Sequence, residues 1–106
     1  MLQNVTIAFI GAGMMGESMI AGLCKEHLVP PEQIIATAPR ADRRDHLRTT
    51  YSVRVTDDNR DAAHEADVVV FCLKPQTLPK VLPTLRGAVQ PNDLVISIIA
   101  GARIAL

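Results

Sequence analysis

Three glycines constrain this chain most: Gly11, Gly13 and Gly16 form a G-x-G-x-x-G motif between a strand-like and a helix-like segment. Residues 5–10 before the motif are β-rich and nearly all apolar, as in a strand buried on both faces of a parallel sheet. From residue 14 onward, apolar residues recur at helical spacing until two prolines at 30 and 31. In this context the glycines allow, in turn, a tight turn, a close approach of the backbone to a pyrophosphate, and close packing of helix on strand. Free amides at the helix start are expected to face the phosphates, so the motif predicts a dinucleotide site.

The rest of the chain continues the alternation of strands and helices. A strand at residues 34–38 closes a βαβ unit of about 30 residues. Helices are expected near residues 41–50 and 60–65, and strands at 53–55, 67–73 and 94–99. A further helix with apolar residues at 78, 81, 82 and 85 must be short or kinked, because Pro83 removes a hydrogen bond from it. The pattern predicts an α/β fold, a Rossmann-type doubly wound, mainly parallel sheet with strand order 3-2-1-4-5 and a ligand crevice between its first and fourth strands.

Composition narrows the class of protein. A chain of 106 residues is one domain, and equal numbers of acidic and basic residues, 11 each, give no basic surface for nucleic acid. Its apolar runs are too short for a membrane span. Cys24 and Cys72 have no disulfide-scaffold or zinc-ligand spacing, so no metal is expected and a reduced, cytoplasmic location fits best. Three scattered histidines, His27, His46 and His64, are interpreted as surface residues.

The end of the second predicted strand bears on which dinucleotide is bound. NAD sites usually place an acidic residue there to hold the ribose diol. In this chain Arg40, Arg43 and Arg44 follow the strand instead, and guanidinium groups hold a 2′-phosphate through charge-assisted hydrogen bonds. We therefore predict NADP as the cofactor, with NADPH preferred and NAD possible. For Arg43 and Arg44, solvation of a helix face beside Asp42 and Asp45 stays an alternative.

Two later segments fall at the carboxyl ends of strands, where the crevice is expected. Lys74 follows the fourth strand and is placed to donate to a ribose hydroxyl or a substrate; a surface lysine before a proline turn is the alternative. The Ala100–Gly101 pair follows the fifth strand and offers a small-residue edge to a flat nicotinamide ring. Met14, Met15 and Met19 are expected to be packing residues, with only backbone contacts to the dinucleotide from the first two.

Three segments together resemble one family. Residues 7–16 (IAFIGAGMMG), 73–76 (LKPQ) and 94–101 (LVISIIAG) are similar to the amino-terminal domain of pyrroline-5-carboxylate reductase, and the resemblance covers nearly the whole chain. The first segment is shared with 6-phosphogluconate and 3-hydroxyisobutyrate dehydrogenases, whereas the other two together are much more specific to the reductase. The resemblance implies reduction of the cyclic imine 1-pyrroline-5-carboxylate to L-proline by NAD(P)H, the last step of proline biosynthesis. The cofactor supplies the hydride in such a reaction.

The resemblance also assigns a cofactor site. It implies a phosphate turn after the first strand, contacts to the adenosine phosphate after the second and an asparagine near the adenosine after the third. It also implies that backbone after the fourth strand lines the nicotinamide ribose and that residues 98–100, after the fifth, form the nicotinamide edge. No catalytic residue is predicted, because Lys74 is the only candidate for protonating the imine and a protonated iminium can arrive from solution. The residues expected to bind the cofactor are Ile10, Gly11, Ala12, Gly13, Met14, Met15, Gly16, Ala38, Arg40, Asn59, Cys72, Leu73, Lys74, Pro75 and Ala100.

The chain departs from the resembled family in two residues and in length. Many members have Asn where this chain has Met14, which puts a polar contact beside the phosphates in doubt, and Pro83 has no functional interpretation. In the family a helical carboxyl-terminal domain forms the dimer and most of the imine pocket. Nothing in residues 1–106 corresponds to it. We therefore expect a single NAD(P)-binding domain with little turnover alone, and a homo-oligomer for a full-length form.

Other interpretations stay open. One is a dehydrogenase of the β-hydroxyacid type or a cofactor-linked NADP reductase with the same turn, against which residues 74–76 argue. A second is a catalytically silent NADP(H)-binding or regulatory module, for which a cofactor half without a substrate half is the expected feature. A third is a degenerate paralogue that no longer binds nucleotide.

Overall fold

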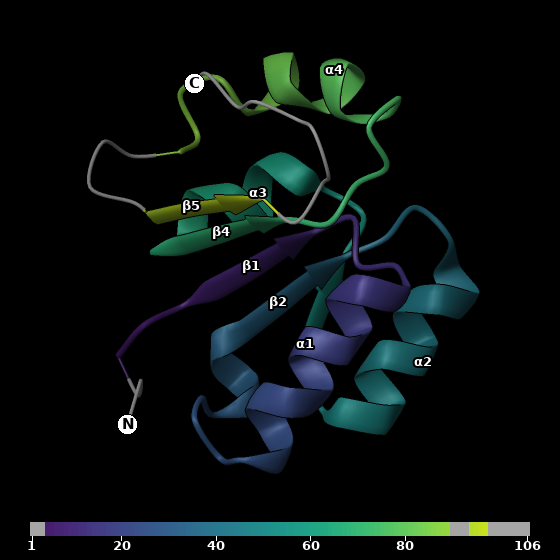
Figure 1. The fold of residues 1–106 in the computed structure, drawn as a ribbon, viewed down its shortest axis with the longest axis vertical. Coiled ribbons are helices and arrows are strands. Elements are labelled where there is room, and N and C mark those ends of the chain that lie inside the picture. The colour runs from purple at the N-terminus through teal and green to yellow at the C-terminus, as the bar shows by residue number, and fades with distance from the viewer. Residues whose placement is uncertain (1–3, 90–93, 98–106) are drawn as a thin grey trace.

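One parallel sheet forms the centre of the molecule (Figure 1). The structure, a computed structural model, describes residues 4–89 and the strand at 94–97. The strand order of the sheet is β3-β2-β1-β4-β5, and every neighbouring pair of strands is parallel. The predicted fold class and strand order are therefore confirmed. The strands are β1 (Ile7–Ile10), β2 (Ile34–Thr37), β3 (Arg54–Thr56), β4 (Val68–Phe71) and β5 (Leu94–Ser97).

The helices connect these strands in the predicted alternation. Pro83 has the predicted effect: the α-helix before it ends at Val81, and the chain continues as a 3₁₀ turn, because proline supplies no amide for the helical ladder. Among the described residues no helix is long and apolar enough to cross a bilayer. The helical segments are α1 (Met14–Lys25), η1 (Pro31–Gln33), α2 (Ala41–Tyr51), α3 (Asn59–Glu65), α4 (Leu78–Val81) and η2 (Leu82–Leu85).

Helices cover both faces of the sheet, and each covered face has its own core. On one face Ile7 and Phe9 of β1 pack with Ile20 of α1 and Leu47 of α2. On the other face the alternate residues of β1 pack with α3, α4 and η2. Figure 1 shows α1 and α2 together on the near side of the sheet. Burial on both faces explains why β1 and β4 have uninterrupted apolar sequences, whereas the edge strand β3 is polar and partly exposed.

Candidate functional site

A cleft of about 740 Å³ opens at the carboxyl ends of β1, β2 and β4. It lies beside the point where the strand order reverses, between β1 and β4. Its walls come from the β1–α1 turn, the β2–α2 corner, the first turns of α2 and the segment after β4. The lining residues are Gly11, Ala12, Gly13, Ala38, Pro39, Arg40, Asp42, Arg43, His46, Cys72, Leu73, Lys74 and Thr77.

The glycine turn, residues 11–13, is fixed to the neighbouring strand by Thr37, the last residue of β2. Thr37 is only 1% exposed. Its hydroxyl oxygen accepts a hydrogen bond from the Gly11 amide at 2.8 Å, and its carbonyl oxygen accepts one from the Ala12 amide at 2.8 Å. The Gly13 amide donates to the Gly11 carbonyl, also at 2.8 Å. These bonds hold the turn in place without a ligand. Sequence reasoning did not identify Thr37, because its role depends on a contact between strands.

A side chain at each glycine of the motif would have a different steric consequence. Gly11 has a φ of +77°, and a Cβ there would lie 2.2 Å from Cδ2 of Leu73. A Cβ on Gly16 would lie 3.2 Å from the sulfur of Cys72, so α1 packs closely on the strand edge. At Gly13 a Cβ would meet no atom within 4 Å. The backbone at Gly13 therefore faces the open cleft, where a bulky ligand can approach it.

The start of α1 is left without a cap. Gly13 is the N-cap residue, and no side chain in residues 4–89 or 94–97 bonds to the first amides of the helix. The first main-chain bond at this end runs from the Glu17 amide to the Gly13 carbonyl at 2.9 Å. Within the described residues, the amides of Met14, Met15 and Gly16 therefore have no acceptor. The free amides follow the turn, since those of residues 11–13 bond within the protein.

The methionines of α1 differ from one another in exposure. Met14 is 82% exposed and Met15 is 61% exposed, so the expectation that both are packing residues is wrong. The reason is that α1 first meets the sheet at Gly16, one residue further along. Met19 lies beyond that point and packs against the core, as predicted.

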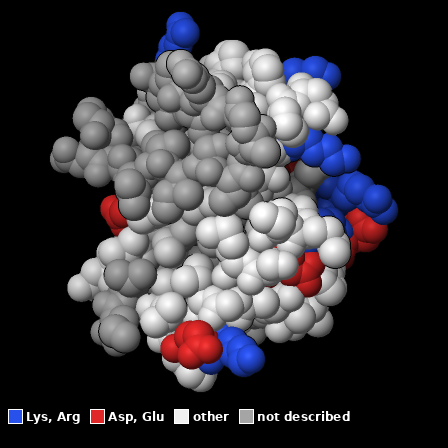
Figure 2. Space-filling view, in the orientation of Figure 1, with Lys and Arg blue, Asp and Glu red and all other residues white. Residues whose placement is uncertain are grey.

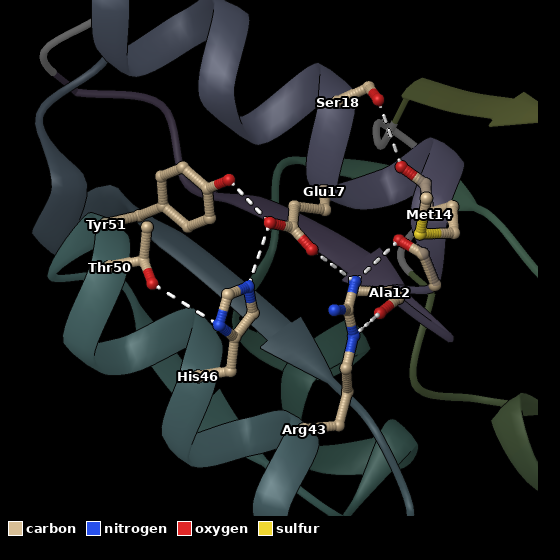
Figure 3. Close-up of polar contacts among 9 residues, drawn as sticks. Ala12, Met14, Glu17, Ser18, Arg43, His46, Thr50 and Tyr51 are labelled. Carbon is tan, nitrogen blue, oxygen red and sulfur yellow. Dashed lines mark hydrogen bonds and ion pairs between the residues drawn. The ribbon is translucent and has the colours of Figure 1, made fainter.

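A polar cluster joins α1 to α2 beside the glycine turn (Figure 3). The Glu17 carboxylate pairs with Arg43 at 2.6 Å through one oxygen. Its other oxygen accepts hydrogen bonds from the Tyr51 hydroxyl at 2.6 Å and from Nε2 of His46 at 2.9 Å. The side chain of Arg43 continues to the turn, where Nε donates to the Ala12 carbonyl at 3.2 Å and Nη2 to the Gly13 carbonyl at 3.1 Å. We call these four side chains the Glu17 cluster.

The cluster stabilises the charged form of its carboxylate. Hydrogen bonds from Tyr51, then His46 and Arg43, lower the pKa of Glu17 from 4.5 to about 2. The same carboxylate raises the pKa of Tyr51. Sequence reasoning missed this cluster, and His46, although exposed as predicted, is part of it. The sequence did contain one indication of the cluster: residues 43, 46 and 51 are spaced so that their polar groups lie on one face of a helix.

The corner between β2 and α2, residues 38–42, carries the exposed charges of the cleft. Arg40 pairs with Asp42 at 2.8 Å, and the two side chains are 77% and 68% exposed. Arg44 does not line the cleft; it donates to the carbonyls of Ala38 and Pro39 at 2.8 and 3.0 Å. Figure 2 shows basic and acidic side chains side by side at the right-hand edge, where α2 begins. Three arginines were proposed for a 2′-phosphate. The described partner of Arg40 is a solvent-exposed side chain, whereas Arg43 and Arg44 both bond to main-chain carbonyls.

The segment after β4 closes the cleft on its other side. Leu73 packs against Gly11, and Lys74 is exposed at the wall. Burial raises the pKa of the Cys72 thiol to about 11, so this sulfur stays protonated and is not an activated nucleophile. The carbonyl of Lys74 accepts the amide of Thr77 at 2.9 Å, which turns the chain into α4.

The structure brings together about half of the predicted cofactor residues. Ile10 is fully buried beneath the cleft, and Asn59 begins α3 away from its lining. Pro75 is exposed beside the lining residues, and Ala100 lies outside the described residues. Met14, Met15 and Gly16 stand just behind the turn, with their amides toward it. The predicted residues on the cleft wall are Gly11, Ala12, Gly13, Ala38, Arg40, Cys72, Leu73 and Lys74.

Comparison with known proteins gives one matching family and several similar enzymes. Residues 6–101 match the family described as NADP oxidoreductase, coenzyme F420-dependent. A pyrroline-5-carboxylate reductase from Synechocystis sp. is 42% identical over 99 residues, which are 93% of this chain and 37% of that protein. The structure of a pyrroline-5-carboxylate reductase from Coxiella burnetii superposes with a TM-score of 0.86 at 34% identity, covering 92% of this chain and 36% of that one. A 3-hydroxyisobutyrate dehydrogenase from Mycobacterium tuberculosis superposes with a TM-score of 0.73 at 28% identity, covering 88% and 31%. The chain thus spans little more than a third of the length of the two reductases.

Proposed function

This chain belongs to the family of coenzyme F420-dependent NADP oxidoreductases, and from that premise we propose that it is the NADP(H)-binding part of a pyrroline-5-carboxylate reductase. The reaction is reduction of the imine of 1-pyrroline-5-carboxylate to L-proline. Within the family, similarity to reductases of this name favours the substrate. The observation that carries the cofactor proposal is the uncapped start of α1 behind a turn that is already held in place.

The residues at the turn fit a pyrophosphate. Free amides of Met14, Met15 and Gly16 at a helix start supply donors and a positive end of the helix dipole. The open space at Gly13 lets two bridged phosphates approach the main chain. Thr37 and Leu73 hold the turn from its two sides. Because the turn is already ordered, little conformational entropy is lost when a ligand binds.

The corner after β2 fits a 2′-phosphate. Arg40 lies on the cleft wall and is exposed, so its guanidinium is accessible to an anion. Guanidinium and phosphate form charge-assisted, often bidentate, hydrogen bonds. Asp42 accepts hydrogen bonds from Nε and Nη2 of Arg40, and a phosphate would compete with it. Arg40 is therefore the residue that we assign to discrimination between NADPH and NADH.

The other wall of the cleft is assigned to the reactive end of the cofactor. When bound, the nicotinamide supplies the hydride for reduction of the imine. Lys74 stands exposed on this wall, and we assign its ammonium to the nicotinamide ribose or the imine substrate. The half-buried, protonated Cys72 forms an uncharged surface beside it.

A calorimetric titration of the chain with NADPH and with NADH tests the proposal. We expect NADPH to bind more tightly than NADH, and Arg40→Glu to weaken NADPH by about 10- to 100-fold while changing NADH by less than about twofold. Arg48→Glu is the matched control, because Arg48 lies on α2 in an exposed pair with Asp45 and does not line the cleft. Absence of binding to either dinucleotide would overturn the cofactor assignment. Reductase activity is measured separately, as loss of NADPH absorbance with 1-pyrroline-5-carboxylate. Turnover would exclude a silent NADP(H)-binding module, whereas binding with little turnover is expected both of such a module and of the cofactor-binding part of a reductase measured alone.

A further inference from the structure

Arg43 is oriented toward the main chain of the glycine turn. Its guanidinium contacts the carbonyl oxygens of Ala12 and Gly13 at 3.2 and 3.1 Å, and the Glu17 carboxylate at 2.6 Å. The side chain is 26% exposed, against 77% for Arg40. Arg43 is thus held by two main-chain carbonyls and a mostly buried carboxylate, whereas the described partner of Arg40 is the single exposed carboxylate of Asp42.

The carbonyl of Gly13 is the most consequential of these acceptors. It receives both Nη2 of Arg43 and the amide of Glu17, which donates at 2.9 Å. Because the C=O and N–H groups of a trans peptide point in opposite directions, fixing the Gly13 carbonyl fixes the direction of the Met14 amide. That amide is the first of the free donors at the start of α1. Arg43 thus controls the orientation of a donor that it does not touch.

The rest of the Glu17 cluster holds Arg43 in this position (Figure 3). Tyr51 and His46 occupy one oxygen of Glu17, which leaves the other oxygen to Arg43. The ion pair also matters electrostatically, since an unpaired carboxylate in the first turn of α1 would repel a phosphate at the same helix start. With the pair formed, the neighbourhood of the free amides carries no net charge from these two side chains.

We propose that Arg43 is a positioning residue for the dinucleotide pyrophosphate: held by Glu17, it orients the peptide groups of the glycine turn so that the amides at the start of α1 face the cleft. This inference rests on the proposed function. It assigns Arg43 a different role from Arg40. Arg43 sets affinity for any dinucleotide, and Arg40 sets the preference for one that carries a 2′-phosphate.

Three ligands separate these roles: NADPH, NADH and adenosine 2′-monophosphate, which has the 2′-phosphate but no pyrophosphate. We expect Arg43→Ala to weaken NADPH and NADH equally, by about tenfold, and to leave the binding of adenosine 2′-monophosphate within about twofold by NMR titration. A general loss of structure would weaken all three. Arg43→Lys keeps the charge but lacks the planar fork that reaches two carbonyls, so an intermediate, equally shared loss is expected. Arg48→Ala is the control for removal of a positive charge from α2.

Each outcome decides a specific point. Loss of NADPH binding without loss of NADH binding in Arg43→Ala would overturn the inference and make Arg43 a second contact to the 2′-phosphate. Unchanged binding of both dinucleotides would also overturn it. Failure of the unsubstituted chain to bind either dinucleotide would instead overturn the proposed function, and the inference with it. If Arg43→Ala does not fold, the comparison of NADPH with NADH in Arg43→Lys decides between the same results.

Discussion

The glycine turn and the β2–α2 corner lie next to each other on the cleft wall, but they are held in different ways. The turn is fixed by the buried Thr37, by contact with Leu73 and by Arg43. The corner carries an Arg40–Asp42 pair whose side chains are both more than two-thirds exposed. Exposed pairs contribute little to stability and exchange partners readily. The difference indicates that the turn is a rigid region for the pyrophosphate, which all dinucleotides share. The corner is an adjustable region for the 2′-phosphate, which distinguishes NADPH from NADH.

The strongest test of the rigid region is Gly11→Ala. The substitution places a Cβ at a φ of +77° and 2.2 Å from Cδ2 of Leu73, so both the backbone and a neighbouring side chain must shift. We expect the free energy of unfolding to fall by about 2 to 3 kcal/mol, measured by urea denaturation. Dinucleotide binding should fall with it, because the turn that leads to the free amides is displaced.

Gly13→Ala is the matched control for this prediction. The residue belongs to the same motif, but its φ is −85° and a Cβ would meet nothing within 4 Å. We expect a change in stability below about 0.5 kcal/mol together with weaker NADPH binding, since the added methyl faces the ligand. Equal losses of stability in the two variants would contradict the assignment of separate roles to Gly11 and Gly13.

A smaller effect is expected from Glu17→Gln, which tests whether the Glu17 cluster contributes to the rigidity of the turn. The pKa of Glu17 is lowered from 4.5 to about 2 in the folded chain, so its ionised form stabilises the fold fully above about pH 4.5 and progressively less as the pH falls toward 2. We expect the variant to be less stable than the unsubstituted chain by about 1 to 2 kcal/mol at pH 7, less than the whole pKa shift implies because the carboxylate is 20% exposed. The difference should shrink as the pH falls from about 4.5 and disappear only below about pH 2, as followed by urea denaturation across the pH range.

Glu65→Gln is the control for the pH series. Glu65 pairs with Arg54 at 2.6 Å, but both side chains are about half exposed and lie outside the cleft lining. We expect this variant to differ from the unsubstituted chain by less than about 0.5 kcal/mol at every pH. A difference between Glu17→Gln and the unsubstituted chain that did not change with pH would show that the carboxylate charge is not what stabilises α1 against α2.

How much the sequence predicts depends on whether a feature is local in the chain. The positions of the strands and the interruption at Pro83 follow from apolar runs and from the missing proline amide, which act over a few residues. The strand order joins distant segments, and it was predictable only because alternating strands and helices form a doubly wound sheet as a general rule. The roles of Gly11 and Gly16 are likewise predictable, because absence of a side chain is a property of the residue itself. These features agree with the structure.

Features that depend on packing between distant segments were not predictable in the same way. Thr37 bonds Gly11 across 26 residues, and Tyr51 bonds Glu17 across 34. Nothing in the motif itself shows that Gly11 needs a neighbouring hydroxyl. The exposure of Met14 also depends on where α1 first contacts the sheet. The sequence therefore predicts the backbone of the candidate site better than the side chains that hold it.

The smallest expected effect, Asp42→Asn, tests the adjustable region. The Asp42 carboxylate accepts two hydrogen bonds from Arg40, at 2.8 and 3.1 Å, and Arg40 in turn lowers its pKa. A 2′-phosphate must displace this carboxylate and is repelled by it, so its neutralisation should tighten NADPH by about threefold and leave NADH unchanged. Asp45→Asn, which removes an equally exposed carboxylate paired with Arg48, is the control, and the gain should shrink at high salt in a calorimetric titration. If Asp42→Asn weakened NADPH instead, Asp42 would be holding Arg40 ready for the phosphate, and the corner would be as preorganised as the turn.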